Sequence, residues 1–393
     1  MFEVDAQSFL TIVVVAAVAA AIVGFGGRRV IVPVVVLELV LGIIVGPSVL
    51  GLAEGDEFID FFASLGLGFL FFFAGYEIDF ERIKGRPLLL AGAGWLISLA
   101  LAYAIGGLLA AAGIVISLLF VGSAMATTAI GTLIPILSDA GELRTRFGTF
   151  LLAAGAVGEF GPILLITLFF STRNPLDAGL ILLAFIAIAV VAAVFAVRGA
   201  QLGWAAIERS METSAQLPIR IAVVLVFALA TLATDLGLDL LLGGFVAGII
   251  TRMALSGREV NVLESKLSAV GYGFLIPFFF VVSGIEFELD AFADDPVKLL
   301  EIPVFLAAFL IVRGVPALAL YRRVLDARDR AALAFFSATE LPLVVAITSI
   351  AIDKGEMRAT TAASLVAAAI LSTAIYPLVG LRLRGDRAAL GGA

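Results

Sequence analysis

Long apolar runs recur along the chain from residue 9 to residue 380, separated by short stretches that hold charges, glycine or proline. As a helix, each run is long enough to cross a hydrocarbon core about 30 Å thick. The runs are continuous and lack the alternation that marks the strands of a membrane barrel. We therefore predict an all-α membrane protein with about thirteen transmembrane helices, over residues 9–27, 30–52, 57–79, 87–112, 114–137, 145–172, 177–199, 217–234, 236–252, 266–289, 297–321, 332–353 and 359–382.

The composition supports this class of protein and excludes others. Of the 393 residues, 62% are hydrophobic and only 15% are charged, and the mean hydropathy is +1.16. Cysteine and histidine are absent, so a proton carried within the membrane has to bind Asp or Glu. Because the sequence holds no serine–histidine pair, His/Cys metal cluster or phosphate-binding loop, we expect no enzyme activity and no cofactor. Membrane lipid is an expected partner, and nucleic acid is not.

The basic residues indicate the orientation in the membrane. Most Lys and Arg residues lie in the loops that follow odd-numbered runs. Loops rich in Lys and Arg face the cytoplasm, so we predict an external N-terminus and a cytoplasmic C-terminus, in the plasma membrane of a prokaryote. The first run has no basic residue before it, unlike a secretory signal, and we interpret it as a retained helix.

Two pairs of segments indicate an internal repeat. Residues 71–76 (FFFAGY) are similar to residues 278–284 (FFFVVSG), and residues 126–128 (ATT) are similar to residues 338–340 (ATE). The members of each pair lie seven runs apart, and because seven is odd, corresponding helices point in opposite directions. Such inverted repeats are typical of secondary transporters. The alternative is chance similarity among apolar runs rich in phenylalanine.

Polar residues next to helix breakers interrupt two of the runs. The fifth run contains Thr127 and Thr128, and the twelfth contains Thr339 and Glu340 shortly before Pro342. Such residues weaken helical hydrogen bonding, and irregular backbone inside a membrane is tolerated where it lines a cavity or is buried in protein. We predict two discontinuous helices that cross and form a site near the membrane midplane. The alternative is a pair of ordinary helices whose Thr hydroxyls bond to their own carbonyls.

Glu159 is the strongest candidate for a transport site. It lies about halfway along the run at residues 145–172, ~21 Å from the cytoplasmic start at 1.5 Å per residue. A carboxylate at that depth costs several kcal/mol unless it has a partner or a function. We predict that Glu159 binds an ion or proton in transit, and that Thr127, Thr128 and freed carbonyls help to hold a monovalent cation. The alternative is a protonated Glu159 that joins two helices by hydrogen bonds.

Arg313 is a second charge inside a run, at residues 297–321. Arginine keeps its proton, so it has to meet a carboxylate or the carbonyls at a helix C-terminus. The candidate partners are Glu340, Glu159 and the negative ends of the interrupted helices. We expect structural pairing to be the main role of Arg313.

Several segments resemble the monovalent cation:proton antiporter superfamily, over roughly residues 10–380. They are residues 46–52 (GPSVLGL), 73–79 (FAGYEID), 126–128 (ATT) together with 156–159 (AVGE), and 243–248 (GGFVAG). In that family, an unwound crossing helix and an ion-binding acid occupy the places of Thr127–Thr128 and Glu159 here.

The resemblance implies a core domain of six helices and a dimerisation domain, which work as a homodimer by an elevator motion. We expect a first half at residues 1–199, an interfacial linker at 200–216 and a second half at 217–393. The core then takes parts of residues 57–172 and 266–382, and the remainder forms the dimerisation domain. We expect no nucleotide-binding regulatory domain in this chain.

Two departures from the family pattern bear on the function. Many electrogenic members have two adjacent Asp residues where this chain has Gly158 and Glu159, and Lys where it has Arg313. Electroneutral members also lack the first acid and have Arg near this point, so the expected function is one-for-one exchange of Na+ or K+ for H+. The alternatives are a symporter of the same architecture that moves an organic solute, and a membrane sensor that does not transport.

Overall fold

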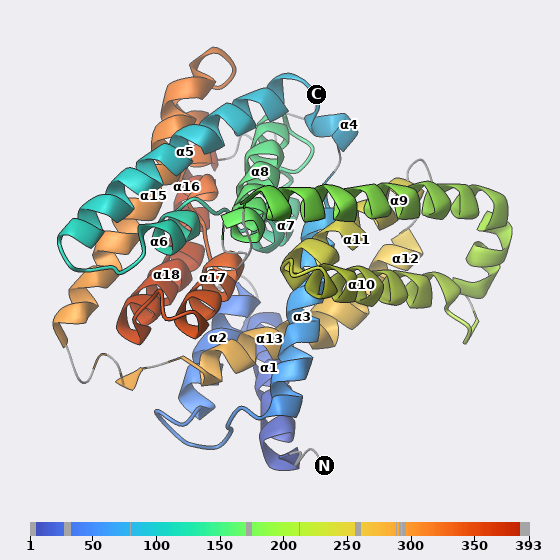
Figure 1. Cartoon of the computed structure of the whole chain (residues 1–393), viewed down its shortest axis with the longest axis horizontal. Helices are drawn as coiled ribbons and strands as arrows, with labels where there is room; N and C mark the ends of the chain where they lie inside the picture. Colours follow the sequence, from blue (N-terminus) through green and yellow to red (C-terminus); the bar gives the residue numbers. More distant parts are fainter. Residues whose placement is uncertain are drawn as a thin grey trace. The chain divides into compact units, whose positions relative to one another are not determined.

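The computed structural model describes residues 5–26, 33–78, 80–169, 175–211, 213–255, 261–287, 289–290, 292 and 296–385. Within these residues the regular elements are helices, and no strand occurs (Figure 1). Ten helical segments of the described chain are long and apolar enough to cross a membrane, one of them, Ala327–Asp353, with a break inside it. The prediction of an all-helical membrane protein is therefore confirmed.

Three shorter apolar segments lie where the second, fifth and ninth spans were expected: Val34–Val45, Leu118–Ile134 and Leu240–Leu255. None of the three is long enough by itself to count among the ten, so a total of thirteen crossings stays a prediction. The expected junction of the first two spans, at residues 27–32, lies outside the described residues.

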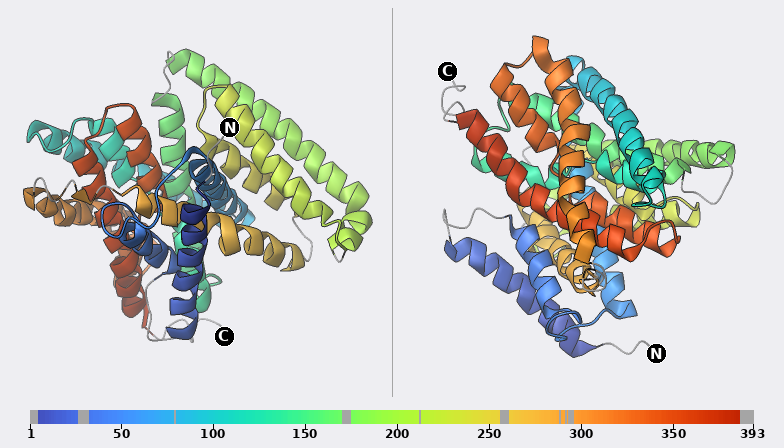
Figure 2. Two further views of the ribbon diagram at one scale, coloured as in Figure 1. Left: turned by 90° about the horizontal axis from the view of Figure 1, so that it is seen from below. Right: turned by 90° about the vertical axis from the view of Figure 1, so that its left-hand side faces the viewer.

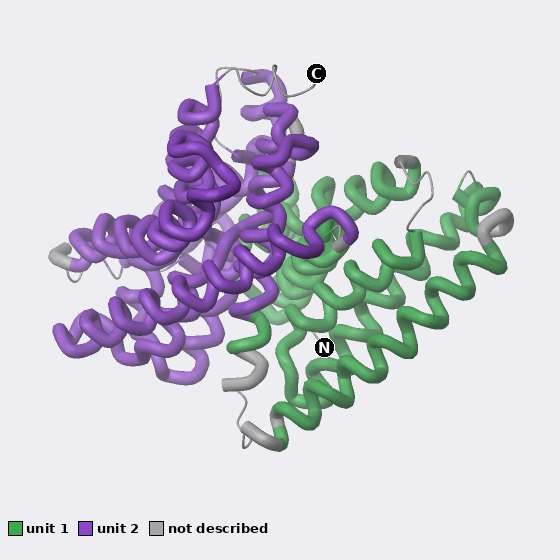
Figure 3. Tube along the Cα trace, turned by 90° about the horizontal axis from the view of Figure 1, so that it is seen from above, with its two compact units in different colours: residues 1–16, 55–79, 163–282 green, residues 17–54, 80–162, 283–393 purple. Residues whose placement is uncertain are grey.

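The chain divides into two compact units (Figure 3). Unit 1 consists of residues 1–16, 55–79 and 163–282, and unit 2 of residues 17–54, 80–162 and 283–393. Residues 57–78 and 266–282 cluster with unit 1, although the sequence favoured including parts of them in the core. Both interruptions and all the candidate site residues belong to unit 2.

Unit 1 is built around helix α11. Its elements are the start of α1 (Ala6–Gly26), α3 (Glu57–Tyr76), the end of α8, α9 (Pro175–Met211), α10 (Leu217–Asp235), α11 (Leu240–Leu255), α12 (Asn261–Val270), the π-helical turn η2 (Gly271–Leu275) and most of α13 (Ile276–Ile285). Helix α11 packs against α3, α9 and α10. Glycines bring α3 and α11 into backbone contact, because a Cβ atom at Gly248 would lie 1.9 Å from the carbonyl oxygen of Phe72.

Helix α9 differs from the sequence expectation. It continues without a break to Met211, through most of the linker expected at residues 200–216. That stretch contains no proline, so nothing in it removes a helical hydrogen bond. The turn comes later and ends at Gln216, which has a left-handed backbone with φ of 46°, directly before α10 begins at Leu217. Helices α9 and α10 then lie side by side (Figure 2).

Unit 2 contains both interrupted helices. Its elements are the end of α1, α2 (Val34–Val45), α4 (Phe80–Ile83), α5 (Arg86–Ala111), α6 (Leu118–Met125), α7 (Ile130–Asp139), most of α8 (Arg146–Phe169), the end of α13, the 3-10 turns η3 (Pro296–Leu300) and η4 (Tyr321–Arg323), α15 (Glu301–Leu320), α16 (Ala327–Ser337), α17 (Pro342–Asp353) and α18 (Ala359–Arg384). Helix α15 contacts α5, α6, α16 and α18, and α17 contacts α6 and α18.

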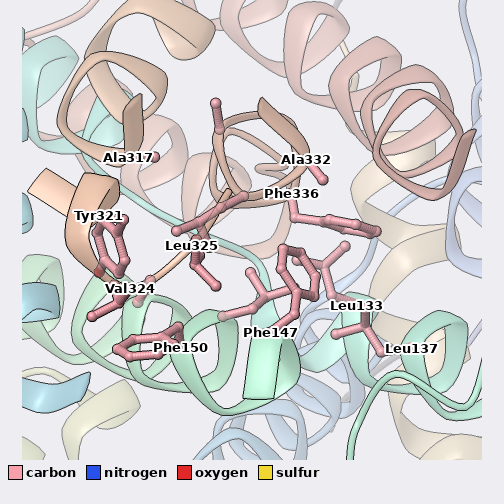
Figure 4. Close-up of a cluster of buried hydrophobic side chains, with 14 of the residues drawn as sticks. Leu133, Leu137, Phe147, Phe150, Ala317, Tyr321, Val324, Leu325, Ala332 and Phe336 are labelled. Atoms are coloured by element: carbon pink, nitrogen blue, oxygen red, sulfur yellow. The ribbon is translucent and has the colours of Figure 1, made fainter. Parts of the chain in front are cut away.

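A buried apolar cluster packs the segment at residues 80–162 of unit 2 against the segment at residues 283–393 (Figure 4). These two segments are called the first and the second half of unit 2. Leu133 and Phe147 come from the first half, and Tyr321, Leu333 and Phe336 from the second. The Phe147 and Phe336 rings lie 5.9 Å apart between centroids. Burial of these large side chains stabilises the arrangement of α7, α8 and α16.

A buried ion-pair network joins the same halves. The Arg384 guanidinium, at the end of α18, donates from Nε and Nη2 to the two carboxylate oxygens of Glu142, at 2.8 Å each. Its Nη1 donates to Asp329 at 2.5 Å. Because Glu142 lies between α7 and α8, the network holds this loop against the ends of α16 and α18.

Candidate functional site

The first interruption, residues 126–129, separates α6 from α7. Its residues leave the helix and are fully buried. The Thr127 hydroxyl donates to the carbonyl oxygen of Ala124 at 3.0 Å, and the Trp95 indole of α5 donates to the carbonyl oxygen of Ala126 at 3.1 Å. Side chains thus add donors to carbonyls at the end of the broken helix, where the regular helical hydrogen bonds stop.

The second interruption, residues 338–341, separates α16 from α17. Pro342 begins α17, and because proline has no N–H group it suits the first turn of a helix. The Glu340 backbone is held by α18: its N–H donates to the Ser372 hydroxyl at 3.0 Å, and its carbonyl oxygen accepts from Ser372 at 3.0 Å and from Thr373 at 3.2 Å. Polar residues of the last helix therefore replace the missing helical hydrogen bonds.

The two interruptions touch each other. The Ala129 N–H donates to the carbonyl oxygen of Thr339 at 2.8 Å, and the Thr128 hydroxyl donates to the carbonyl oxygen of Ser337 at 2.6 Å. The ends of four half-helices therefore meet in unit 2, as the positions of Thr127–Thr128 and Thr339–Glu340 in the sequence predicted.

Arg313 of α15 lies where the interruptions meet and is only 5% exposed. Its Nε and Nη2 both donate to the Thr128 hydroxyl, at 3.0 and 2.7 Å, and its Nε also donates to the carbonyl oxygen of Ser337 at 3.3 Å. Further bonds reach the Ser98 hydroxyl at 3.3 Å and the Ala154 carbonyl oxygen at 3.2 Å. The guanidinium thus joins α5, α8 and the ends of both interrupted helices.

Three kinds of partner were expected for Arg313: Glu340, Glu159 and the negative end of an interrupted helix. The structure shows the helix end. Ser337 is the last residue of α16, so the guanidinium faces the negative end of that helix. Among the described residues, no carboxylate lies within the 4.0 Å of an ion pair with Arg313. Neither Glu159 nor Glu340 is directly paired with it.

Glu159 lies on α8 and is 4% exposed. Its Oε1 accepts a long hydrogen bond of 3.4 Å from the N–H of Gly131, in the first turn of α7. Its Oε2 has no hydrogen-bond partner among the described residues. The carboxyl group therefore faces the positive end of a half-helix and has one oxygen available for a ligand.

Glu340 brings a second carboxyl group to the same region. It is completely buried. Within the described part of the chain neither of its carboxylate oxygens has a hydrogen-bond partner, since the Thr127 hydroxyl donates its proton to Ala124. A buried polar atom without a partner is costly, so this group is suited to binding a proton or a cation.

The two threonines of the first interruption differ in their availability. The Thr128 oxygen accepts from two nitrogens of Arg313 and donates to Ser337, which uses the whole bonding capacity of a hydroxyl. The Thr127 hydroxyl donates to Ala124 and keeps its lone pairs. In this conformation Thr127 is the better placed of the two to coordinate a cation, and Thr128 holds Arg313.

Sequence reasoning missed the residues that support the site from neighbouring helices: Trp95 and Ser98 of α5, and Ser372 and Thr373 of α18. The sequence marks some of these residues as unusual. The chain has only two tryptophans, and Ser372–Thr373 is a polar pair inside the last apolar run. Nothing in the sequence, however, says which helices face the interruptions.

A family model and several known proteins match this chain, and all of them are described as sodium/proton exchangers or antiporters. The family model described as sodium/hydrogen exchanger, transmembrane, matches residues 13–380. The putative Na(+)/H(+) antiporter YjbQ of Bacillus subtilis is 27% identical over 366 residues, which cover 88% of this chain and 58% of YjbQ. The Na(+)/H(+)-K(+) antiporter GerN of Bacillus cereus is 25% identical over 281 residues, 67% of each chain.

A solved structure shows the same fold. The sodium proton antiporter MjNhaP1 from Methanocaldococcus jannaschii matches with a TM-score of 0.66 and 17% identity, over 96% of this chain and 99% of that one. The chain spans little more than half the length of YjbQ. The match of the family model over nearly the whole described chain confirms the resemblance, and the protein belongs to the sodium/hydrogen exchanger family of membrane transporters.

Proposed function

We propose that this protein exchanges Na+ or K+ for H+ across the membrane and that Glu159 binds each cargo in turn. The observation that carries the proposal is a buried Glu159 carboxyl group beside the first turn of α7, with Oε2 free of partners among the described residues. Relatives named as Na(+)/H(+) and Na(+)/H(+)-K(+) antiporters support the choice of cargo.

Exchange follows from competition for one carboxyl group. A bare carboxylate in the protein interior is costly, and either a proton or a monovalent cation removes that cost. Since one group cannot hold both, loading one cargo requires release of the other. Hard cations prefer oxygen ligands, and the Thr127 hydroxyl and backbone carbonyls of the first interruption are the candidates, since this interruption leads directly into the first turn of α7 that Glu159 faces. Thr128 contributes by fixing Arg313 in place.

The charges at the crossing favour one-for-one exchange. Arg313 keeps its positive charge, and Glu159 and Glu340 can each be negative. With both acids ionised the three groups sum to one negative charge, which one Na+, K+ or H+ neutralises. Both loaded forms then have the same charge, so a full cycle moves no net charge across the membrane.

We propose an elevator motion in which unit 2 carries the site relative to unit 1. The interruptions, Glu159, Arg313 and Glu340 all lie within unit 2, which supports its assignment as the mobile core. Unit 1 then serves as the dimerisation domain of a homodimer. We place the protein in the plasma membrane of a prokaryote. Its N-terminus then lies outside the cell and its C-terminus in the cytoplasm, as the distribution of basic residues among the loops indicates.

The test is cation-driven proton flux in proteoliposomes with an acidic interior, to which Na+ or K+ is added outside. The wild type is expected to release internal protons when the cation is added. Glu159→Gln is expected to abolish this flux, because the amide cannot bind a proton in exchange for a cation. Glu81→Gln, at an exposed residue of α4, is the matched control and keeps the flux. Undiminished flux in Glu159→Gln would remove Glu159 from the mechanism.

The same vesicles test the stoichiometry. Electroneutral exchange is insensitive to an imposed membrane potential, and a clear voltage dependence would reject the one-for-one cycle. Uptake of an organic solute driven by Na+ or H+ would instead identify a symporter. Absence of flux together with absence of cation-induced thermal stabilisation would identify a protein that does not transport.

A further inference from the structure

Gly158, the residue before Glu159 on α8, has no space for a side chain. A Cβ atom built at Gly158 would lie 2.6 Å from Nη2 of Arg313, 2.8 Å from Oγ1 of Thr128 and 2.9 Å from Cβ of Thr128. Such distances are far below ordinary van der Waals contact. The Arg313 guanidinium and the Thr128 side chain that it binds therefore together occupy the volume that any larger residue at position 158 would need.

The guanidinium cannot move aside without loss. Its Nη2, the atom closest to the added Cβ, donates to the Thr128 hydroxyl and to the Ala154 carbonyl oxygen, and its other nitrogens bond to Ser98 and Ser337. A shift of Nη2 would leave a buried acceptor without its donor. It would also release Thr128, which holds the two interruptions together through Ser337.

We infer that Gly158 is a positioning residue: its missing side chain provides the space that holds Arg313 at the meeting point of the two interruptions. The identities of residues 158 and 313 are therefore coupled: the size of residue 158 limits how large a positively charged side chain position 313 can accommodate. This inference rests on the proposed function only where transport is the readout.

The geometry also says which pair of residues can replace Gly158 and Arg313. Lysine keeps the positive charge but ends in a single unbranched ammonium group. It has no counterpart of Nη2, the atom that a methyl group at position 158 would meet. Lysine at 313 therefore removes the shortest of the three contacts and the two hydrogen bonds that hold the Thr128 hydroxyl toward the guanidinium. Thr128 can then shift away from a methyl group at position 158, while a positive charge still faces the end of α16 at Ser337.

The experiment is a double-mutant cycle with Gly158→Ala, Arg313→Lys and the double variant. Each variant is measured by thermal midpoint in detergent and by cation-driven proton flux. Gly158→Ala alone is expected to lower the flux by about tenfold or more, because small misplacements of a site group have large effects on rate. Its thermal midpoint falls as well. In the Arg313→Lys background the same substitution has a clearly smaller further effect on both quantities, because only the two contacts with Thr128 remain.

Gly155→Ala is the matched control on the same helix. Its Cβ would lie 2.6 Å from Cδ1 of Ile130, so it is equally crowded but does not meet Arg313. Arg313→Lys is expected to rescue Gly158→Ala and not Gly155→Ala.

Several results would overturn the inference. Equal losses from Gly158→Ala in both backgrounds would show that the two residues do not share space. The inference would also be overturned if neither Gly158→Ala nor the double variant folds while Arg313→Lys folds normally. If Gly158→Ala fails to fold and the double variant folds, the inference is supported. A wild type without flux would reject the proposed function, but the thermal cycle would still test the coupling.

Discussion

Thr128 shows how much one hydroxyl can hold at this site. It accepts two hydrogen bonds from Arg313 and donates one to the carbonyl oxygen of Ser337. The hydroxyl thus joins the first interruption, the second interruption and α15. Loss of this one oxygen would remove three hydrogen bonds at once and leave Nε and Nη2 of Arg313 with only their longer bonds to Ser337 and Ala154.

The substitution Thr128→Val tests the contribution of this hydroxyl, because it keeps the shape of the side chain. Valine nearly matches threonine in volume but has no hydroxyl, and hydrogen bonds to charged groups contribute most when buried. We expect destabilisation by roughly 2 kcal/mol or more, seen as a lower thermal midpoint in detergent. Thr132→Val is the control, since the Thr132 hydroxyl only donates to Ala129 in the same region of α7. Equal effects of the two substitutions would contradict the assigned role of Thr128.

Site residues could be predicted from the sequence where a charge or a pair of threonines stood out in an apolar run. Glu159, Arg313 and Glu340 were visible for that reason, and the structure brings their neighbourhoods together in unit 2. The partner of Arg313 could not be chosen from the sequence, because a carboxylate and a helix end satisfy a guanidinium equally well in principle. Trp95 was missed because its role depends only on which face of α5 meets the first interruption.

At the scale of elements, glycines decide how closely α3 and α11 approach. A Cβ at Gly248 would lie 1.9 Å from the Phe72 carbonyl oxygen, and a Cβ at Gly75 would lie 2.0 Å from the Phe245 carbonyl oxygen. Each helix thus contributes a glycine where the other presents backbone. Close approach through small residues is a common way to pack helices in membranes, where van der Waals contact replaces the hydrophobic effect.

Gly248→Ala is therefore expected to destabilise the protein by about 1–3 kcal/mol or more, because backbone atoms cannot turn away as a side chain can. The measurement is the thermal midpoint in detergent. Gly92→Ala is the control, since a Cβ at Gly92 meets nothing within 4 Å and alanine favours helix by about 1 kcal/mol over glycine. A Gly248→Ala variant as stable as Gly92→Ala would show that the two backbones are not in contact.

Element boundaries could be predicted in part. Proline and paired threonines correctly located the interruptions between α6 and α7 and between α16 and α17. Charged and polar residues at 200–216 suggested a separate linker, but charges alone do not end a helix, and α9 continues to Met211. The structure shows the chain turning at residues 213–216, where Gln216 adopts a left-handed conformation directly before α10.

At the scale of the whole molecule, the division into two units matters because the proposed mechanism requires one unit to move as a rigid body. Contacts inside unit 2 support its movement as a rigid body. Arg313 joins the two interruptions, the Arg384–Glu142 pair joins the α7–α8 loop to α18, and the apolar cluster around Phe147 joins α8 to α16. Each of these contacts connects the first sequence half of unit 2 to the second, and a buried charged pair is costly to separate.

A cysteine pair within unit 2 tests the rigid-body motion. The chain has no native cysteine, and a Cβ at Gly94 of α5 would lie 3.7 Å from Cβ of Pro316 in α15, within the range for a disulfide. If unit 2 moves as one body, oxidation of the Gly94→Cys/Pro316→Cys variant leaves cation-driven proton flux within about twofold of its reduced form. The single-cysteine variants, treated with the same oxidant, show any effect of oxidation itself. If the disulfide forms and flux stops until reductant is added, α5 and α15 have to separate during transport, and the cycle involves rearrangement inside unit 2 rather than its movement as a whole.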